Sequence, residues 1–210
     1  NAGAVAVRLN SDGSLDTSFG NEGKWATEDQ YFLIAQEVLI QPDDKIVITG
    51  WGGGYTKVVR LNPDGVYDNT FGDNGQSNLT IWAAGGQNSM VDLELQPDGK
   101  ILVSGYKSPE SAIVRLNVDG TLDTSFGVSG IAIVKPSLLG PGASRVYGLK
   151  IGLSSDNSIL AAGVYAENTI IHTGFVIRFN SDGQIDTTFG ENGIPLFYGL
   201  TYHISDLFVL

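Results

Sequence analysis

The feature that most constrains the fold is a motif of 13 residues that occurs four times along the chain. Its copies read RLNSDGSLDTSFG, RLNPDGVYDNTFG, RLNVDGTLDTSFG and RFNSDGQIDTTFG, and they are called signatures 1 to 4 (residues 8–20, 60–72, 115–127 and 178–190). Their first residues are 52, 55 and 63 positions apart. Recurrence at roughly 40–50 residues is typical of arrays of small structural units. The sequence therefore predicts a repeat protein in which the repeated part is scaffold.

The segments between signatures have the pattern of short strands. In the segment 76–117, residues 77–82 are strand-like, and residues 90–96 alternate between apolar and polar, as in a half-buried strand. A Pro97-Asp-Gly turn separates that run from strands at 100–105 and 112–117. Four antiparallel strands per repeat are typical of a propeller blade. We therefore predict an all-β fold, an arc of about four β-propeller blades that can belong to a larger ring; a parallel β-solenoid is the alternative.

We expect one repeat domain over residues 1–210. Its blade parts are predicted at 1–10, 24–62, 76–117, 131–180 and 194–210. The first and last parts each hold only some of a blade's strands. Propellers generally close with 4–8 blades, so completion of the ring by flanking sequence or by another chain is expected.

Each signature is expected to join neighbouring blades. Its Asn-x-Asp-Gly segment favours a turn, with glycine free to adopt positive φ. The phenylalanine near its end is placed to fill the space between neighbouring sheets, and its burial contributes roughly 1.5–3 kcal/mol. The glycines that follow, such as Gly72 and Gly75, are expected to bend the chain into the first strand of the next blade. An ion pair such as Arg8 with Asp16 is a further structural possibility for the signature.

The combination RLNxDGxxDxxFGxxG followed by xLQPDGKILVxG resembles the delta-60 repeat, a bacterial β-propeller repeat of undefined function. The resemblance covers essentially the whole chain and departs most in the third copy, where residues 152–158 replace LQPDGK. It implies a β-propeller in an exported, often cell-surface, bacterial protein. It implies no catalytic residues.

Composition excludes several classes of function. The net charge of −11 repels phosphate backbones, so no nucleic-acid partner is expected. No apolar run approaches the roughly 18–20 residues that span a bilayer, so no membrane insertion is expected. Without cysteine the chain has no disulfides and no thiolate-bound zinc. Its histidines, His172 and His203, belong to no metal motif such as HExxH, and we predict no catalytic residues.

The acids of the signature offer a weak calcium candidate, formed by Asn10, Asp12 and Asp16. An EF-hand alignment fails, because Arg8 takes the first ligand position and Phe19 the position of the bidentate glutamate. Another calcium geometry stays open. The alternative is that each aspartate caps its own turn, in which case no cofactor is needed.

Aromatic residues gather in or beside the connections whose length and sequence vary between repeats. These connections are expected as loops near residues 51–56, 106–111 and 164–174, and near 29–34, 83–89, 136–145 and 199–203. The candidate ligand-binding residues are Trp51, Tyr55, Trp82, Tyr106, Tyr165, Tyr198 and Tyr202. Binding residues are often carried by loops on a rigid scaffold, and exposed aromatics bind sugar rings or protein partners. The alternative is that these rings cover the rim of the core.

The sequence thus favours a non-enzymatic module of an extracellular or cell-surface protein, active in adhesion through a protein or glycan partner. A structural spacer with no ligand of its own is the alternative. An enzyme centred on the propeller channel is a third hypothesis.

Overall fold

The computed structural model describes residues 3–27, 34–52, 55–80, 92–167, 171–190, 193–197 and 207. The chain forms two compact units. Unit 1 comprises residues 1–85 with 119–121, and unit 2 comprises 86–118 and 122–210. Within the described residues, no helix is long and apolar enough to cross a membrane.

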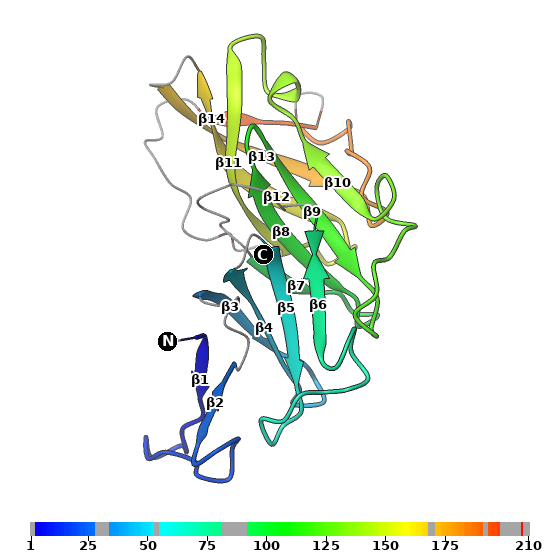
Figure 1. The fold of residues 1–210 in the computed structure, drawn as a ribbon. Coiled ribbons are helices and arrows are strands. Elements are labelled where there is room, and N and C mark those ends of the chain that lie inside the picture. The colour runs from blue at the N-terminus through cyan, green and yellow to red at the C-terminus, as the bar shows by residue number, and fades with distance from the viewer. Residues whose placement is uncertain are drawn as a thin grey trace. The chain divides into compact units, whose positions relative to one another are not determined.

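Unit 1 contains two antiparallel sheets (Figure 1). Sheet I pairs β1 (Val5–Val7) with β2 (Lys24–Ala26). Sheet II has the order β3-β4-β5-β6, formed by β3 (Ile34–Ile40), β4 (Ile46–Gly52), β5 (Tyr55–Leu61) and β6 (Gln76–Leu79). The core of this unit packs Ala4, Phe19 and Trp25 against Ile46, Ile48, Val59 and Leu61.

Unit 2 contains two four-stranded antiparallel sheets. Sheet III consists of β7 (Asp92–Leu95), β8 (Ile101–Lys107), β9 (Glu110–Leu116) and β10 (Ile131–Val134). Sheet IV consists of β11 (Ala143–Leu153), β12 (Ile159–Glu167), β13 (Ile171–Phe179) and β14 (Leu196–Phe197). A short 3-10 helix, η2 (Pro136–Leu138), lies between β10 and β11. These antiparallel four-stranded sheets confirm the predicted all-β class.

The strands are grouped differently from the predicted blade parts. The strand after each signature joins the sheet that precedes the signature: β6 pairs with β5, β10 with β9, and β14 with β13. The prediction that the glycines lead into the next blade was therefore wrong. The signature folds back on its own sheet, with Asp68 N donating to Arg60 O at 2.9 Å and Arg60 N to Gly75 O at 2.9 Å. These bonds return the chain to the free edge of β5. A single domain over residues 1–210 stays a prediction.

The signature and the tight turn after each sheet's first strand lie at the same end of the sheet. In sheet II the turn is closed by Gln41 N donating to Lys45 O at 2.8 Å. The Lys45 ammonium reaches Asp68 of signature 2, with Nζ 3.1 Å from Oδ2. Lys100 and Asp123 form the same contact in sheet III, at 2.9 Å. The repeated connections therefore share one end of the sheet in both sheet II and sheet III.

At the opposite end the strands are longer than expected. Loops were predicted at 51–56, 106–111 and 164–174, but β8 runs to Lys107 and β9 starts at Glu110. β4 and β12 also extend into the predicted loops. Tight hairpins leave few residues at the end, so aromatic residues expected in loops belong to strands.

Candidate functional site

Each signature is held together by its own arginine and second aspartate. Arg8 Nε lies 2.8 Å from Asp16 Oδ2, and the equivalent distance is 2.7 Å in the other three copies. The same guanidinium stacks over the phenylalanine of its signature, 4.6–4.9 Å from the ring centre. Such cation–π contacts contribute about 0.5–2 kcal/mol. The predicted pair of Arg8 with Asp16 is confirmed.

Successive signatures are bonded to one another. Gly20 N donates to Asp64 O at 2.7 Å, and Gly127 N donates to Asp182 O at 2.7 Å. The arginine adds a second bond, since Arg115 Nη1 donates to Ser181 O at 2.5 Å and Arg8 Nη1 donates to Pro63 O. The prediction that the signatures join neighbouring sheets is therefore confirmed within each unit.

The phenylalanine of one signature packs against the Asp-Gly turn of the next. Phe126 is fully buried, and a Cβ added to Gly183 would lie 2.7 Å from its ring. A Cβ added to Gly65 would likewise lie 2.9 Å from the ring of Phe19. Glycine is required at these turns because its φ is near +84° and because the ring fills the space a side chain would need.

Two of the calcium candidates, Asp12 and Asp16, each cap their own turn. Asp12 accepts from Ser14 N at 2.9 Å and Ser14 Oγ at 2.6 Å, and these bonds lower the pKa of Asp12. Asp16 accepts from Ser18 in the same manner, with a lowered pKa, and Asn10 Nδ2 donates to Ser14 Oγ at 3.0 Å. In the part of the chain that the structure describes, no three His, Asp or Glu residues gather where they could hold a metal ion. The arrangement has the geometry of turn capping.

Two of the predicted ligand-binding aromatics are buried in strands, which corrects their expected place in exposed loops. Tyr165 in β12 is 1% exposed, and its hydroxyl donates to Glu167 Oε1 at 3.0 Å. Tyr106 in β8 packs on Tyr147, with ring centres 5.6 Å apart. Because β8 and β12 run further than predicted, strand alternation directs these rings into the core.

The other aromatic candidates divide into two sets. Trp51 lies near the end of β4 and is half-buried, while Tyr55 begins β5 and only its backbone is described. Trp82, Tyr198 and Tyr202 lie outside the described residues, as does His203. Their role in binding stays a prediction.

An acidic residue of sheet III links it to sheet IV. Asp92 in β7 accepts from Ile151 N at 2.8 Å and pairs with Lys150 Nζ at 3.0 Å. Burial, together with the charge of Asp92, raises the pKa of Glu94. Asp92 thus joins the edge strands of two sheets, so its polar contacts serve the packing of unit 2.

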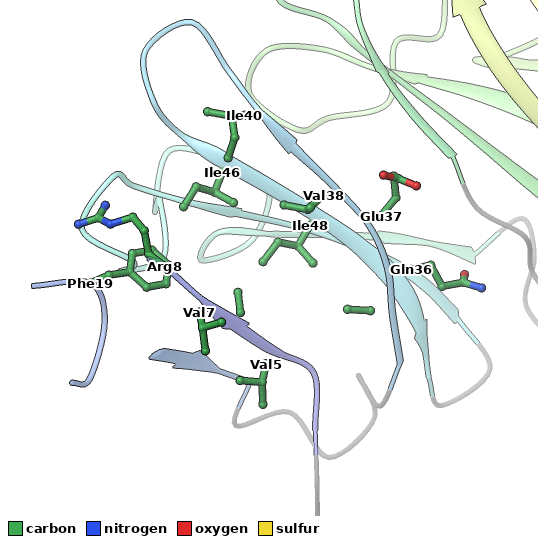
Figure 2. Close-up of a pocket in the computed structure, with 12 residues that line it drawn as sticks. Val5, Val7, Arg8, Phe19, Gln36, Glu37, Val38, Ile40, Ile46 and Ile48 are labelled. Carbon is green, nitrogen blue, oxygen red and sulfur yellow. The ribbon is translucent and has the colours of Figure 1, made fainter. Parts of the chain in front are cut away.

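The sequence did not predict an apolar groove in unit 1. The groove has a volume of about 510 Å³ and lies between β1 and the first two strands of sheet II. Figure 2 shows Val38, Ile46 and Ile48 facing the strand that carries Val5 and Val7. The full lining is Val5, Ala6, Val7, Arg8, Phe19, Ala35, Gln36, Glu37, Val38, Ile40, Ile46 and Ile48. Several of these apolar side chains are more than half exposed, namely Val5, Val7, Val38 and Ile40.

The four signatures, each bonded internally and to its neighbour within the same unit, form the seams between the sheets. The antiparallel sheets and these seams define the class of protein, a β-propeller repeat protein. The family described as "Domain of unknown function (DUF5122) beta-propeller" matches residues 3–19, 41–71, 96–126 and 154–189, more than half of the chain. The chain belongs to this family. The delta-60 name given to the resemblance stays a prediction.

Other comparisons add little. No curated protein matches the sequence. Among solved structures, an endo-1,4-beta-xylanase from Bacteroides thetaiotaomicron matches with a TM-score of 0.46 and 12% identity, over 81% of this chain and 54% of the xylanase chain. The chain thus spans about half the length of that protein, and a likeness this distant carries no argument about activity.

Proposed function

We propose that this chain is a non-enzymatic β-propeller module of an exported or cell-surface bacterial protein, and that it acts by binding a protein partner. The observation that carries the proposal is the apolar groove of unit 1. Val5, Val7, Val38 and Ile40 are each 54–58% exposed and line one groove. Contiguous exposed apolar surface marks sites of association more often than isolated exposed residues do.

The seams support a module without catalysis. The arginine and the second aspartate of each signature are paired with each other, and the first aspartate of signature 1 is bonded to its own turn. These side chains recur in the sequence because they hold the loops and join the sheets. The repeated polar residues are thus accounted for by scaffold roles.

A glycan partner bound by aromatic rings is less well supported than a protein partner. Tyr106 and Tyr165 are buried, which removes two of the predicted stacking rings. A structural spacer is the alternative that the seams favour, since sheets joined by hydrogen bonds between their signatures form a stiff array without any ligand. The exported location rests on the family resemblance and is tested by fractionating cells that produce the full-length protein.

The experiment is photo-crosslinking from the groove. For this experiment Ile40 is replaced by a photoreactive amino acid, and the chain is incubated with the surface and secreted proteins of the producing organism. We expect one defined protein to be crosslinked, with Val38→Glu abolishing its capture and Val66→Glu, on a signature loop, leaving it intact. Capture that is insensitive to Val38→Glu, or no capture at all, would contradict binding at the groove. Glycan binding lost in Trp51→Ala would favour the aromatic loops instead.

A further inference from the structure

We infer that the groove accepts a β-strand with this protein's own repeat sequence, of the type Lys-Ile-Leu-Val-Ser-Gly found in β8. The inference rests on the proposed function, because it names the protein segment that the groove binds. The incoming strand adds to the free edge of β1 and inserts its leucine among the apolar side chains of sheet II.

Two strands at the same repeat position, β3 and β11, differ in how far they are covered. Equivalent turns follow β3 and β11, closed by Gln41 N to Lys45 O at 2.8 Å and by Ser154 N to Ser158 O at 2.9 Å. Counting back from these turns, Val38 corresponds to Ile151. Val38 is 56% exposed, whereas Ile151 is 4% exposed. The structural element that covers Ile151 in unit 2 has no counterpart among the described residues of unit 1.

The covering element in unit 2 is β8 with its neighbour β9. Leu102 of β8 and Ile113 of β9 belong to the same buried cluster as Ile151 and Ile159. A polar contact fixes the strand's position, since Ser104 Oγ donates to Leu149 O at 2.6 Å. Leu102 and Ser104 are two residues apart and so point to the same side of β8. The leucine fills the apolar space while the serine holds the backbone of β11.

The edge of β1 that faces away from β2 also favours the addition of a strand. Counting from the arginines of signatures 1 and 3, β1 corresponds to β9. β9 pairs with β8 at one edge and with β10 at the other, while within the described ranges β1 pairs with β2 alone. An unpaired edge presents backbone donors and acceptors to an added strand. Strand addition obtains affinity from main-chain bonds and specificity from alternate side chains.

The register of the added strand follows from the pairing in sheet III. There Leu102 lies opposite Arg115, Val103 opposite Val114, and Ser104 opposite Ile113. By the same count, the leucine of the incoming strand lies opposite Arg8, its following valine opposite Val7, and its serine opposite Ala6. The leucine then faces the groove lined by Val38, Ile46 and Ile48.

The test uses the full chain and a fluorescent peptide with the sequence of residues 100–107, KILVSGYK. We expect saturable binding in fluorescence polarisation, at least tenfold weaker for the peptide with Leu102→Asp and for the chain with Val38→Glu. Val66→Glu is the matched control, since Val66 is also 56% exposed but lies outside the groove. The chain with this change should bind the peptide normally.

The register is tested separately by disulfide trapping, which is clean because the chain has no cysteine. Val7→Cys in the chain should crosslink to a peptide with Val103→Cys, since facing residues in antiparallel strands lie within disulfide reach. A peptide with Leu102→Cys should crosslink at least fivefold more slowly. Equal crosslinking of both peptides would overturn the assigned register and with it the inference.

Failure of the inference is distinct from failure of the proposed function. Equal binding of the parent and Leu102→Asp peptides, or no binding by either, would overturn the repeat strand as occupant, even if photo-crosslinking still captures a groove-dependent protein. Sedimentation distinguishes a further occupant. Self-association of the chain that is abolished by Val38→Glu and unaffected by the peptide would assign the groove to a second copy and overturn the inference.

Discussion

β3 and β11 occupy the same position in their sheets, yet one is exposed and the other buried. Val38 in β3 lines an open groove, whereas Ile151 in β11 lies in the core of unit 2. Both side chains are β-branched and apolar, so the strands' own sequences do not explain the difference. Leu102 and Ile113 of the preceding sheet pack on β11. In this fold a strand's burial is thus decided by the sheet beside it.

The largest effect is expected from placing the same charge at these two positions. Ile151→Glu should lower the free energy of unfolding by about 5 kcal/mol, because it puts an unpaired carboxylate among buried apolar side chains. Val38→Glu should cost less than about 1 kcal/mol, as expected for an exposed strand position. Urea denaturation followed by circular dichroism measures both. Similar losses would show that the two positions have the same environment and break the comparison.

A second pair of variants compares two phenylalanines at one signature position. Phe126 is fully buried against the next signature, while Phe189 is only partly buried. Phe126→Ala should cost about 3–5 kcal/mol through lost burial and a cavity. Phe189→Ala should cost less than about 2 kcal/mol. The same denaturation experiment applies, and a larger loss for Phe189→Ala would argue against the seam as the source of stability.

A third pair separates backbone conformation from packing at the seam. Gly13 and Gly183 both adopt φ +84°, but only Gly183 lies against a phenylalanine ring. Gly13→Ala should cost about 1–2 kcal/mol for the left-handed backbone. Gly183→Ala should cost about 1–3 kcal/mol more, because its Cβ would meet Phe126. Melting temperatures report the difference, and equal shifts would show that the ring moves away without cost.

The smallest effect is expected from protonating the Asp123 carboxylate in signature 3. Partial burial raises the pKa of Asp123, but hydrogen bonds from Ser125 and Lys100 and the charge of Arg115 lower it well below its usual range. A carboxylate with a lowered pKa in the folded state stabilises the protein above the unfolded pKa near 3.9, and this contribution is lost as pH falls below that value. Asp123→Asn should cost about 1 kcal/mol at pH 7 after screening by water.

The control for this prediction is the pH profile itself. The melting temperature of the parent chain should fall as pH decreases from 5 to 2, and the decrease should be shallower in Asp123→Asn. Asp16→Asn removes a more exposed pair, with side chains 35% and 23% exposed, and should flatten the profile less. A profile unchanged by Asp123→Asn would show that this carboxylate is not linked to acid stability.

Local patterns predicted the strands, the turns and the bonded signatures. The turn at Pro97-Asp-Gly, closed by Gln96 N donating to Lys100 O, and the ion pair of Arg8 with Asp16 follow from short stretches whose partners are near in sequence. The pairing of β6 with β5 could not be predicted, because a strand after a loop can join either the previous or the next sheet with the same sequence pattern. Which of the two sheets β6 joins depends on how the signature folds back, and this fold-back is determined by backbone hydrogen bonds.

The candidate site was harder to predict for the same reason. Tyr106 and Tyr165 were expected in loops because they fall within segments whose length and sequence vary between repeats, yet short hairpins place them in buried strands. The groove was missed because Val38 and Ile40 read as ordinary strand residues. Only the arrangement of neighbouring strands distinguishes an open position from a covered one.

The bonds between signatures use carbonyl oxygens of the Asn-x-Asp-Gly turn as acceptors, at the position before aspartate and at aspartate itself. Every amino acid supplies a carbonyl, so the variable residue can be serine, proline or valine without loss of the acceptor, as at Ser11, Pro63 and Val118. A duplicated unit therefore keeps these backbone bonds whichever variable residue its neighbour's turn carries. Only the side-chain contacts between the sheets, such as that of Asp92 with Lys150, then have to match at a new junction.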